Sequence, residues 1–94
     1  MPSVSRLDPE ARASLVARLK RIEGQARGIR QMIDDDRDCT AVLDQIASIK
    51  AAINGLSGEA AESFALFCLA NPDQFDSPED AVSQMVRTVI RAGR

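Results

Sequence analysis

Apolar residues recur along this chain in alternating steps of three and four, which is the spacing of one face of an α-helix. The first stripe, in residues 9–34, consists of Leu15, Leu19, Ile22, Ala26, Ile29 and Ile33. The second, in residues 39–69, consists of Val42, Ile46, Ile49, Ile53, Leu56, Ala60, Phe64 and Phe67. A shorter third stripe in residues 78–91 consists of Val82, Met85, Val86 and Val89. The pattern predicts an all-α protomer of three helices with a long second helix.

Polar residues that cap helices stand where each stripe begins. The candidate N-caps are Asp8 before Pro9, Asp36 or Asp38 before the second helix, and Ser77 before Pro78. Asp80 follows Ser77 by three residues, which is a capping-box pattern. The acidic run 34–36 opposes the helix dipole at a C-terminus, so we expect the first helix to end there.

Length and composition fit a small helical protein. The 94 residues, of which 45% are hydrophobic, predict a single domain over residues 1–94. So short a chain buries little apolar surface alone, which favours oligomerisation. With no apolar leader and no membrane-length apolar run, we expect a soluble cytoplasmic protein without a membrane partner. Cysteines in that compartment are typically reduced, reactive or metal-binding rather than paired in a structural disulfide.

Charge is distributed unevenly although the net charge is only −2. Residues 1–30 carry an excess of basic side chains, residues 31–80 a large excess of acidic ones, and residues 81–94 are basic again. Nucleic acid responds to the local field more than to the total, so this distribution permits a DNA-binding face. Ordinary solvated helix faces account for it equally well.

The two cysteines, Cys39 and Cys68, lie at opposite ends of the long second helix. Their separation is roughly 43 Å along that helix, yet it is close to a whole number of turns, so both project from one face. They meet only if a second copy lies antiparallel, which predicts a two-fold dimer with two Cys39–Cys68′ sites and its axis near Ile53–Asn54. The competing interpretation makes Cys68 a small buried hydrophobe beside Phe67.

Three segments carry a family resemblance: "RLKRIEGQARGIRQMIDDDRDC", "VLDQIASIKAAINGL" and "ESFALFC". With Arg18, Arg21, Gly24 and Gln25 in the first, residues 15–69 resemble the copper-sensing operon repressors of the CsoR/RcnR type. The resemblance implies an antiparallel dimer in which the second helix crosses its twin, and a disc-like tetramer. It also implies a repressor that binds operator DNA without a helix-turn-helix and releases it when an inducer modifies the dimer interface. Because the chain has no histidine and its carboxylates cluster in turns, no general base stands beside a nucleophile, and we expect no enzymatic activity.

Residues at the implied inducer site distinguish the branches of this family. Copper sensors have Cys, His and Cys at the positions of Cys39, Phe64 and Cys68, whereas nickel and cobalt sensors need additional histidines. Formaldehyde sensors pair an N-terminal proline, matched here by Pro2, with a cysteine at position 39 and a histidine at position 64. This chain has no histidine. Its two cysteines with Phe64 most resemble the CstR-like repressors that sense persulfide and polysulfide.

The ligand atoms that the two cysteines offer limit the inducers that this site can bind or react with. Two thiolates without imidazole suit neither zinc nor nickel, but they can bind Cu(I) linearly. Facing thiols also suit sulfur transfer, in which one takes a sulfane sulfur and the other closes a disulfide or longer bridge. We therefore favour a sulfane-sulfur inducer with Phe64 as an apolar wall and no cofactor. Cu(I) bound by Cys39 and Cys68 is the alternative, and formaldehyde a further one.

The predicted DNA contacts are Arg18, Arg21 and Gln25 on one border of the first helix, and Lys50 on the second. Phosphate contacts by Arg and Lys supply salt-dependent affinity, and Gln can reach a base edge or a phosphate. Intersubunit ion pairing of the two arginines is the competing interpretation. Three other basic residues point elsewhere and are expected to be solvated: Arg12, Lys20 and Arg27.

Overall fold

The computed structural model describes residues 3–92, and these residues form three α-helices with two short 3-10 turns. Helix α1 spans Pro9–Asp34, α2 spans Cys39–Ala70 and α3 spans Pro78–Ala92. The turns η1, Val4–Arg6, and η2, Pro72–Gln74, precede α1 and α3. The predicted all-α fold of three helices with a long second helix is confirmed.

The connection between α1 and α2 is a short acidic turn. Helix α1 ends at Asp34, and Asp36 adopts the left-handed conformation with φ 54°, which short polar side chains tolerate better than most. Asp38, not Asp36, then caps α2, because its Oδ2 accepts a hydrogen bond of 3.2 Å from the backbone N–H of Ala41. The turn reverses the chain and fixes the register between the two long helices.

At the other two helix starts, the predicted Ser77 cap is confirmed, whereas the capping box and the Asp8 cap are not. Ser77 Oγ accepts a 3.0 Å hydrogen bond from the backbone N–H of Asp80. The Asp80 carboxylate does not complete the predicted capping box, since it accepts instead from Gln84 Nε2 at 3.0 Å. Asp8 stands at the N-cap position of α1, but its side chain makes no capping hydrogen bond.

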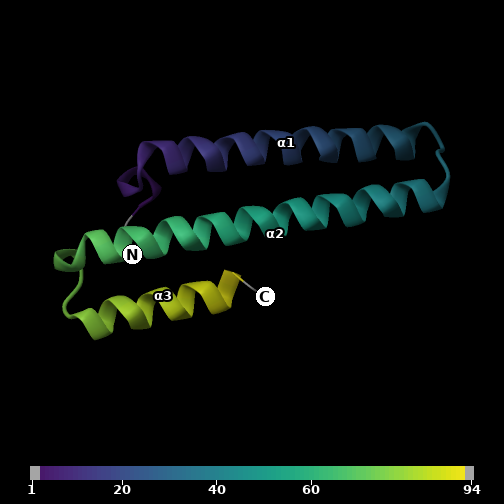
Figure 1. Cartoon of the computed structure of the whole chain (residues 1–94). Helices are drawn as coiled ribbons and strands as arrows, with labels where there is room; N and C mark the ends of the chain where they lie inside the picture. The colour runs from purple at the N-terminus through teal and green to yellow at the C-terminus, as the bar shows by residue number, and fades with distance from the viewer. Residues whose placement is uncertain (1–2, 93–94) are drawn as a thin grey trace.

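The helices lie side by side in a single layer (Figure 1). Helices α1 and α2 form a long antiparallel hairpin, and α3 turns back along the C-terminal half of α2, on the side opposite α1. The protomer measures 55 × 25 × 13 Å along its principal axes, so it is flat and elongated. A single layer of helices has no interior in which to bury a large core.

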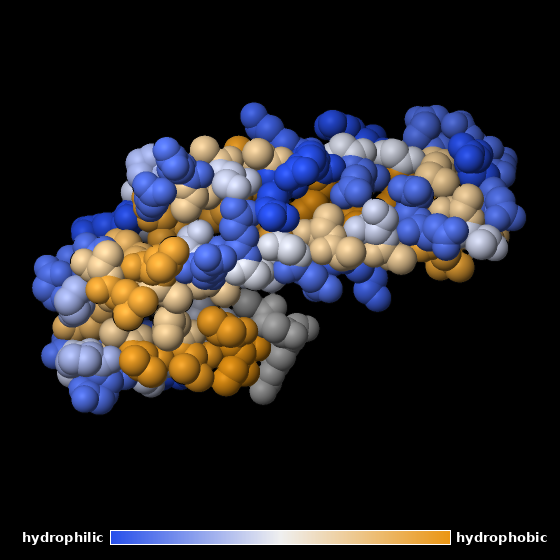
Figure 2. Space-filling view, in the orientation of Figure 1, coloured by the Kyte–Doolittle hydropathy of each residue, from blue (hydrophilic) through white to orange (hydrophobic). Residues whose placement is uncertain are grey.

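Burial in the described residues reflects this shape. Phe67, Cys68 and Ala81 are the only buried apolar residues of that part of the chain, the first two near the end of α2 and the third in the first turn of α3. Many large apolar side chains stay exposed, among them Leu19, Ile33, Leu43, Ile46, Ile53, Val82, Val86 and Ile90. Figure 2 shows apolar side chains gathered over α3 and the adjoining end of α2. The protomer therefore leaves apolar helix faces uncovered, while the antiparallel dimer and the tetramer stay predictions.

None of the helices in residues 3–92 combines the length and the apolar character needed to cross a membrane.

Candidate sensor thiols and nucleic-acid interface

The two thiols sit at opposite ends of α2 in contrasting surroundings. Cys39 is the first residue of the helix and is exposed, whereas Cys68 is 7% exposed. Both are free cysteines, and a helix of this length separates them by roughly 43 Å. Within the described residues of one protomer, no group of three or more His, Cys, Asp or Glu side chains is arranged to hold a metal ion. One chain alone does not bring Cys39 and Cys68 together.

Burial changes the chemistry of Cys68. The residue lies one turn after Phe64, near the junction of α2 with α3, where Ala81 is also buried. Desolvation raises the pKa of the Cys68 thiol, and a weaker hydrogen-bond contribution from the backbone opposes it. Because the thiolate is the nucleophile and the metal ligand, Cys68 is the less reactive thiol until a partner or an inducer changes its surroundings.

Phe64 lines an apolar hollow between α2 and α3. The hollow has a volume of about 300 Å³, and its other lining residues are Leu56, Ser57, Ala60, Ala61, Thr88 and Val89. The Phe64 ring offers no atom that can ligate a metal, so the turn preceding Cys68 presents hydrocarbon toward α3. This placement is compatible with the predicted role of Phe64 as an apolar wall, which remains a prediction.

The structure brings three of the four predicted DNA contacts together. Arg18, Arg21 and Gln25 line one open hollow of about 150 Å³ against Ala52 of α2. Lys50 is exposed on α2 and does not line this hollow. The polar border of α1 is thus a compact cationic site facing the groove between the two helices.

Two contacts across the hairpin hold this cluster. Gln25 Nε2 donates to Ser48 Oγ at 3.5 Å. Arg18 Nε forms an ion pair with Glu59 Oε2 of the same chain, so its pairing is within the protomer rather than between subunits. Ser14 Oγ donates to the other oxygen of Glu59. That hydrogen bond, together with Arg18, lowers the pKa of the Glu59 carboxyl despite its partial desolvation.

Glu59 was not among the residues predicted from the sequence. The signal that points to it is the short acidic turn, because folding two helices about residues 35–38 places the 14–18 segment of α1 beside the 55–59 segment of α2. Helical periodicity alone shows that Ser14 and Arg18 share a face. It does not identify the residue that opposes them.

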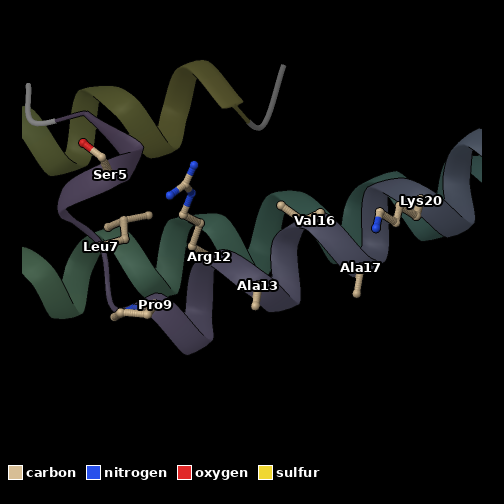
Figure 3. A pocket seen from close by; sticks show the side chains of 8 residues that line it. All are labelled: Ser5, Leu7, Pro9, Arg12, Ala13, Val16, Ala17 and Lys20. Atoms are coloured by element: carbon tan, nitrogen blue, oxygen red, sulfur yellow. The ribbon is translucent and has the colours of Figure 1, made fainter.

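A separate groove follows the other side of α1. It has a volume of about 540 Å³ and is lined by Ser5, Leu7, Pro9, Arg12, Ala13, Val16, Ala17 and Lys20 (Figure 3). Arg12, Lys20 and Arg27 are exposed, as predicted, and the first two belong to this groove rather than to the Arg18 cluster. Pro2, the residue that matches the N-terminal proline of formaldehyde sensors, lies outside the described residues.

Comparisons with known proteins define the class of this helical protomer. The profile described as "Metal-sensitive transcriptional repressor" matches residues 11–92. The copper-sensing transcriptional repressor CsoR of Bacillus subtilis (strain 168) is 39% identical over 69 residues, covering 73% of this chain and 68% of that protein. An uncharacterized protein in the bioA 5′ region of Serratia marcescens is 33% identical over 78 residues, covering 83% and 86%. The chain belongs to the metal-sensitive transcriptional repressor family.

Two solved structures share the fold. The copper-sensing repressor CsoR with Cu(I) from Geobacillus thermodenitrificans NG80-2 superposes with a TM-score of 0.78 and 30% identity, covering 100% of this chain and 94% of that one. The nickel-responsive transcriptional regulator InrS gives a TM-score of 0.75 and 26% identity, covering 85% and 90%. The resemblance to the CsoR/RcnR type predicted from the sequence is therefore confirmed at the level of the family.

Proposed function

We propose that this chain is a Cu(I)-responsive repressor that binds operator DNA when its thiols are free and releases DNA when Cys39 and Cys68′ of an antiparallel dimer bind the metal. The observation that carries the proposal is the pair of free cysteines at the two ends of one face of α2, with exposed Leu43, Ile46 and Ile53 between them. Pairing two such faces head to tail covers the apolar stripe and brings each cysteine to its counterpart.

Donor chemistry supports Cu(I) over other metals. Soft thiolates select Cu(I), and a two-coordinate linear site is complete with two sulfurs. Zinc and nickel need further nitrogen or sulfur donors, and a chain without histidine has no imidazole to give. The relatives that are named copper-sensing repressors support the same inducer. We therefore place Cu(I) ahead of the sulfane-sulfur inducer favoured by the sequence pattern alone.

The Arg18, Arg21 and Gln25 cluster supplies the DNA contacts in this proposal, with Lys50 as a further cation on α2. One protomer presents few positive charges, so an oligomer that pools several copies of the cluster gains the phosphate contacts that tight binding needs. Inducer binding at the ends of α2 alters the packing between the two α2 helices and shifts the dimer away from its DNA-binding state.

Reactive sulfur is the second candidate, because Phe64 occupies the position where copper sensors have a third ligand. The exposed Cys39 thiolate attacks the outer sulfur of a persulfide RSSH, which gives Cys39–S–SH and releases the thiolate RS⁻. The Cys68′ thiol then attacks Cys39 Sγ and breaks the bond between Sγ and the outer sulfur. This forms the Cys39–Cys68′ disulfide, and the outer sulfur leaves as H₂S with the proton of the Cys68′ thiol. Formaldehyde is the least supported inducer, since the chain has no histidine.

Fluorescence anisotropy tests the proposal with the DNA upstream of the chain's own gene and reduced protein under anaerobic conditions. We expect Cu(I), delivered from a chelator of known affinity, to release the DNA, and C39S and C68S to bind DNA but to ignore Cu(I). Release by an organic persulfide but not by Cu(I), with an interchain bridge seen by mass spectrometry, would replace copper by reactive sulfur. A protein that binds no such DNA in any state would contradict the repressor assignment.

A further inference from the structure

Glu59 is an unexpected neighbour for a DNA-binding arginine. Two residues one turn apart on α1 contact its carboxylate: Ser14 Oγ donates to one oxygen, and Arg18 Nε pairs with the other. The Glu59 side chain is 23% exposed and its Oε2 is excluded from solvent, whereas Arg18 keeps 39% of its side chain exposed. The acid is thus fixed inside the groove while part of the guanidinium still faces solvent.

The atom through which Arg18 pairs decides what it can still bind. The contact with Glu59 is made by Nε rather than by the terminal nitrogens Nη1 and Nη2. A guanidinium presents five N–H donors in a rigid fork, and holding the Nε edge orients the other donors. Arg18 also lines the hollow that it shares with Arg21 and Gln25.

Gly55 supplies the second constraint. It lies one turn before Glu59 on α2, and a Cβ built there would stand 3.0 Å from Arg18 Nη1. A side chain at position 55 would therefore require the end of the Arg18 side chain to shift by a few tenths of an ångström. Gly58 on the same helix has nothing within 4 Å of the corresponding position, so close approach is specific to Gly55.

We infer that Glu59 and Gly55 are positioning residues, which hold Arg18 so that its terminal nitrogens are set for a DNA phosphate in the hollow it shares with Arg21 and Gln25. Because both residues lie on α2, movement of α2 relative to α1 displaces the arginine. The ion pair thus links the helix that carries both thiols to the cationic cluster on α1. The inference rests on the proposed DNA-binding function of that cluster.

Four single variants test the inference by anisotropy with the upstream DNA and inducer-free protein. Glu59→Gln and Glu62→Gln remove the same charge from neighbouring turns of α2, so their difference isolates positioning from bulk electrostatics. Gly55→Ala and Gly58→Ala make the same helix-favouring change, and only the first crowds Arg18. We expect E59Q and G55A to weaken binding about fivefold or more, and E62Q and G58A to stay within about twofold of the wild type.

Salt dependence and a double variant give readouts that a purely structural role would not move. If Arg18 no longer neutralises its phosphate, the slope of log K against log salt should decrease in magnitude by about 0.9. In the Arg18→Ala background, E59Q and G55A should have no further effect, since they act through Arg18.

The outcomes separate the inference from the proposed function. Wild-type protein that does not bind the DNA overturns the function itself. If the wild type binds the DNA, either of two results overturns the inference and leaves the function intact. In the first, E59Q binds the DNA as tightly as E62Q. In the second, E59Q reduces the affinity by the same factor whether or not Arg18 is present.

Discussion

The two halves of α2 have opposite relations to the rest of the protomer. The C-terminal half, residues 55–70, packs between α1 and α3 and contains the buried Phe67 and Cys68 (Figure 1). The N-terminal half, residues 39–54, has α1 on one side only, and Leu43, Ile46 and Ile53 remain 64%, 37% and 44% exposed. The C-terminal half, here called the closed half, is covered within the chain. The N-terminal half, here called the open half, exposes apolar surface that a second chain can cover.

The contrast extends to the thiols, because each half of α2 ends in a cysteine. A sensor that joins Cys39 to Cys68′ combines an accessible thiol from the open half of one chain with a shielded thiol from the closed half of another. In the proposed sensor, this arrangement would favour small, soft inducers, since the inducer must reach a buried sulfur.

The largest effect should come from a charge placed in the open half. Ile53→Asp puts a carboxylate where we expect the two α2 helices to cross, and burying it unpaired should raise the dimer dissociation constant at least about a thousandfold, ~4 kcal/mol. Sedimentation equilibrium measures this. Val16→Asp is the matched control, because Val16 on α1 is also 44% exposed. A stable I53D dimer would place the interface elsewhere.

Mutations in the closed half should lower the stability of the protomer. Phe67→Ala removes the ring of one of the few buried residues, and we expect it to cost about 3 kcal/mol in free energy of unfolding. Denaturant titration followed by circular dichroism, at one protein concentration throughout, measures the loss. Leu69→Ala, at a site 78% exposed, should stay within about 0.5 kcal/mol. Equal losses from the two would remove the distinction between the halves.

Thiol reactivity should separate the two ends by a smaller factor. We expect iodoacetamide to alkylate the exposed Cys39 at least about tenfold faster than the buried Cys68, as followed by peptide mass spectrometry. Burial raises the pKa of the Cys68 thiol, so its alkylation rate should rise only at higher pH than is usual for a cysteine. Faster labelling of Cys68 in the native state would show that α3 does not shield it.

The smallest effect concerns the start of the open half. Asp38→Ala removes the hydrogen bond to the Ala41 N–H and should destabilise the protein by about 1 kcal/mol. Asp8→Ala serves as the control at the start of α1, where the side chain makes no such bond, and should cost less. Thermal melts of the two variants compare the losses of stability directly. Equal losses would contradict a capping role for Asp38.

Much of the fold could be predicted from patterns of neighbouring residues. The three apolar stripes and the caps Asp38 and Ser77 are properties of neighbouring residues, so periodicity and spacing sufficed to predict the helices. The Asp80 capping box failed because Gln84, one turn later, competes for the same carboxylate. The single domain over residues 1–94 stays a prediction.

The candidate site could be predicted only in part, because it depends on how the helices pack against one another. The Arg18–Glu59 ion pair depends on the register of the hairpin, and the burial of Cys68 depends on the side of α2 that α3 covers. Neither follows from the spacing of residues within one helix. The sequence could therefore place Arg18, Arg21 and Gln25 on one border, but it could not show which α2 residues hold them.

The meeting of Cys39 with Cys68′ is tested most directly by mixing the two single-cysteine variants. C39S keeps only Cys68 and C68S keeps only Cys39, so a mixed dimer holds one thiol of each kind at one of its two sites. With the thiol oxidant diamide, we expect the mixture to form a disulfide-linked dimer joined through residues 39 and 68, and each variant alone to form little. Efficient crosslinking of either variant alone, or none in the mixture, would contradict the antiparallel arrangement.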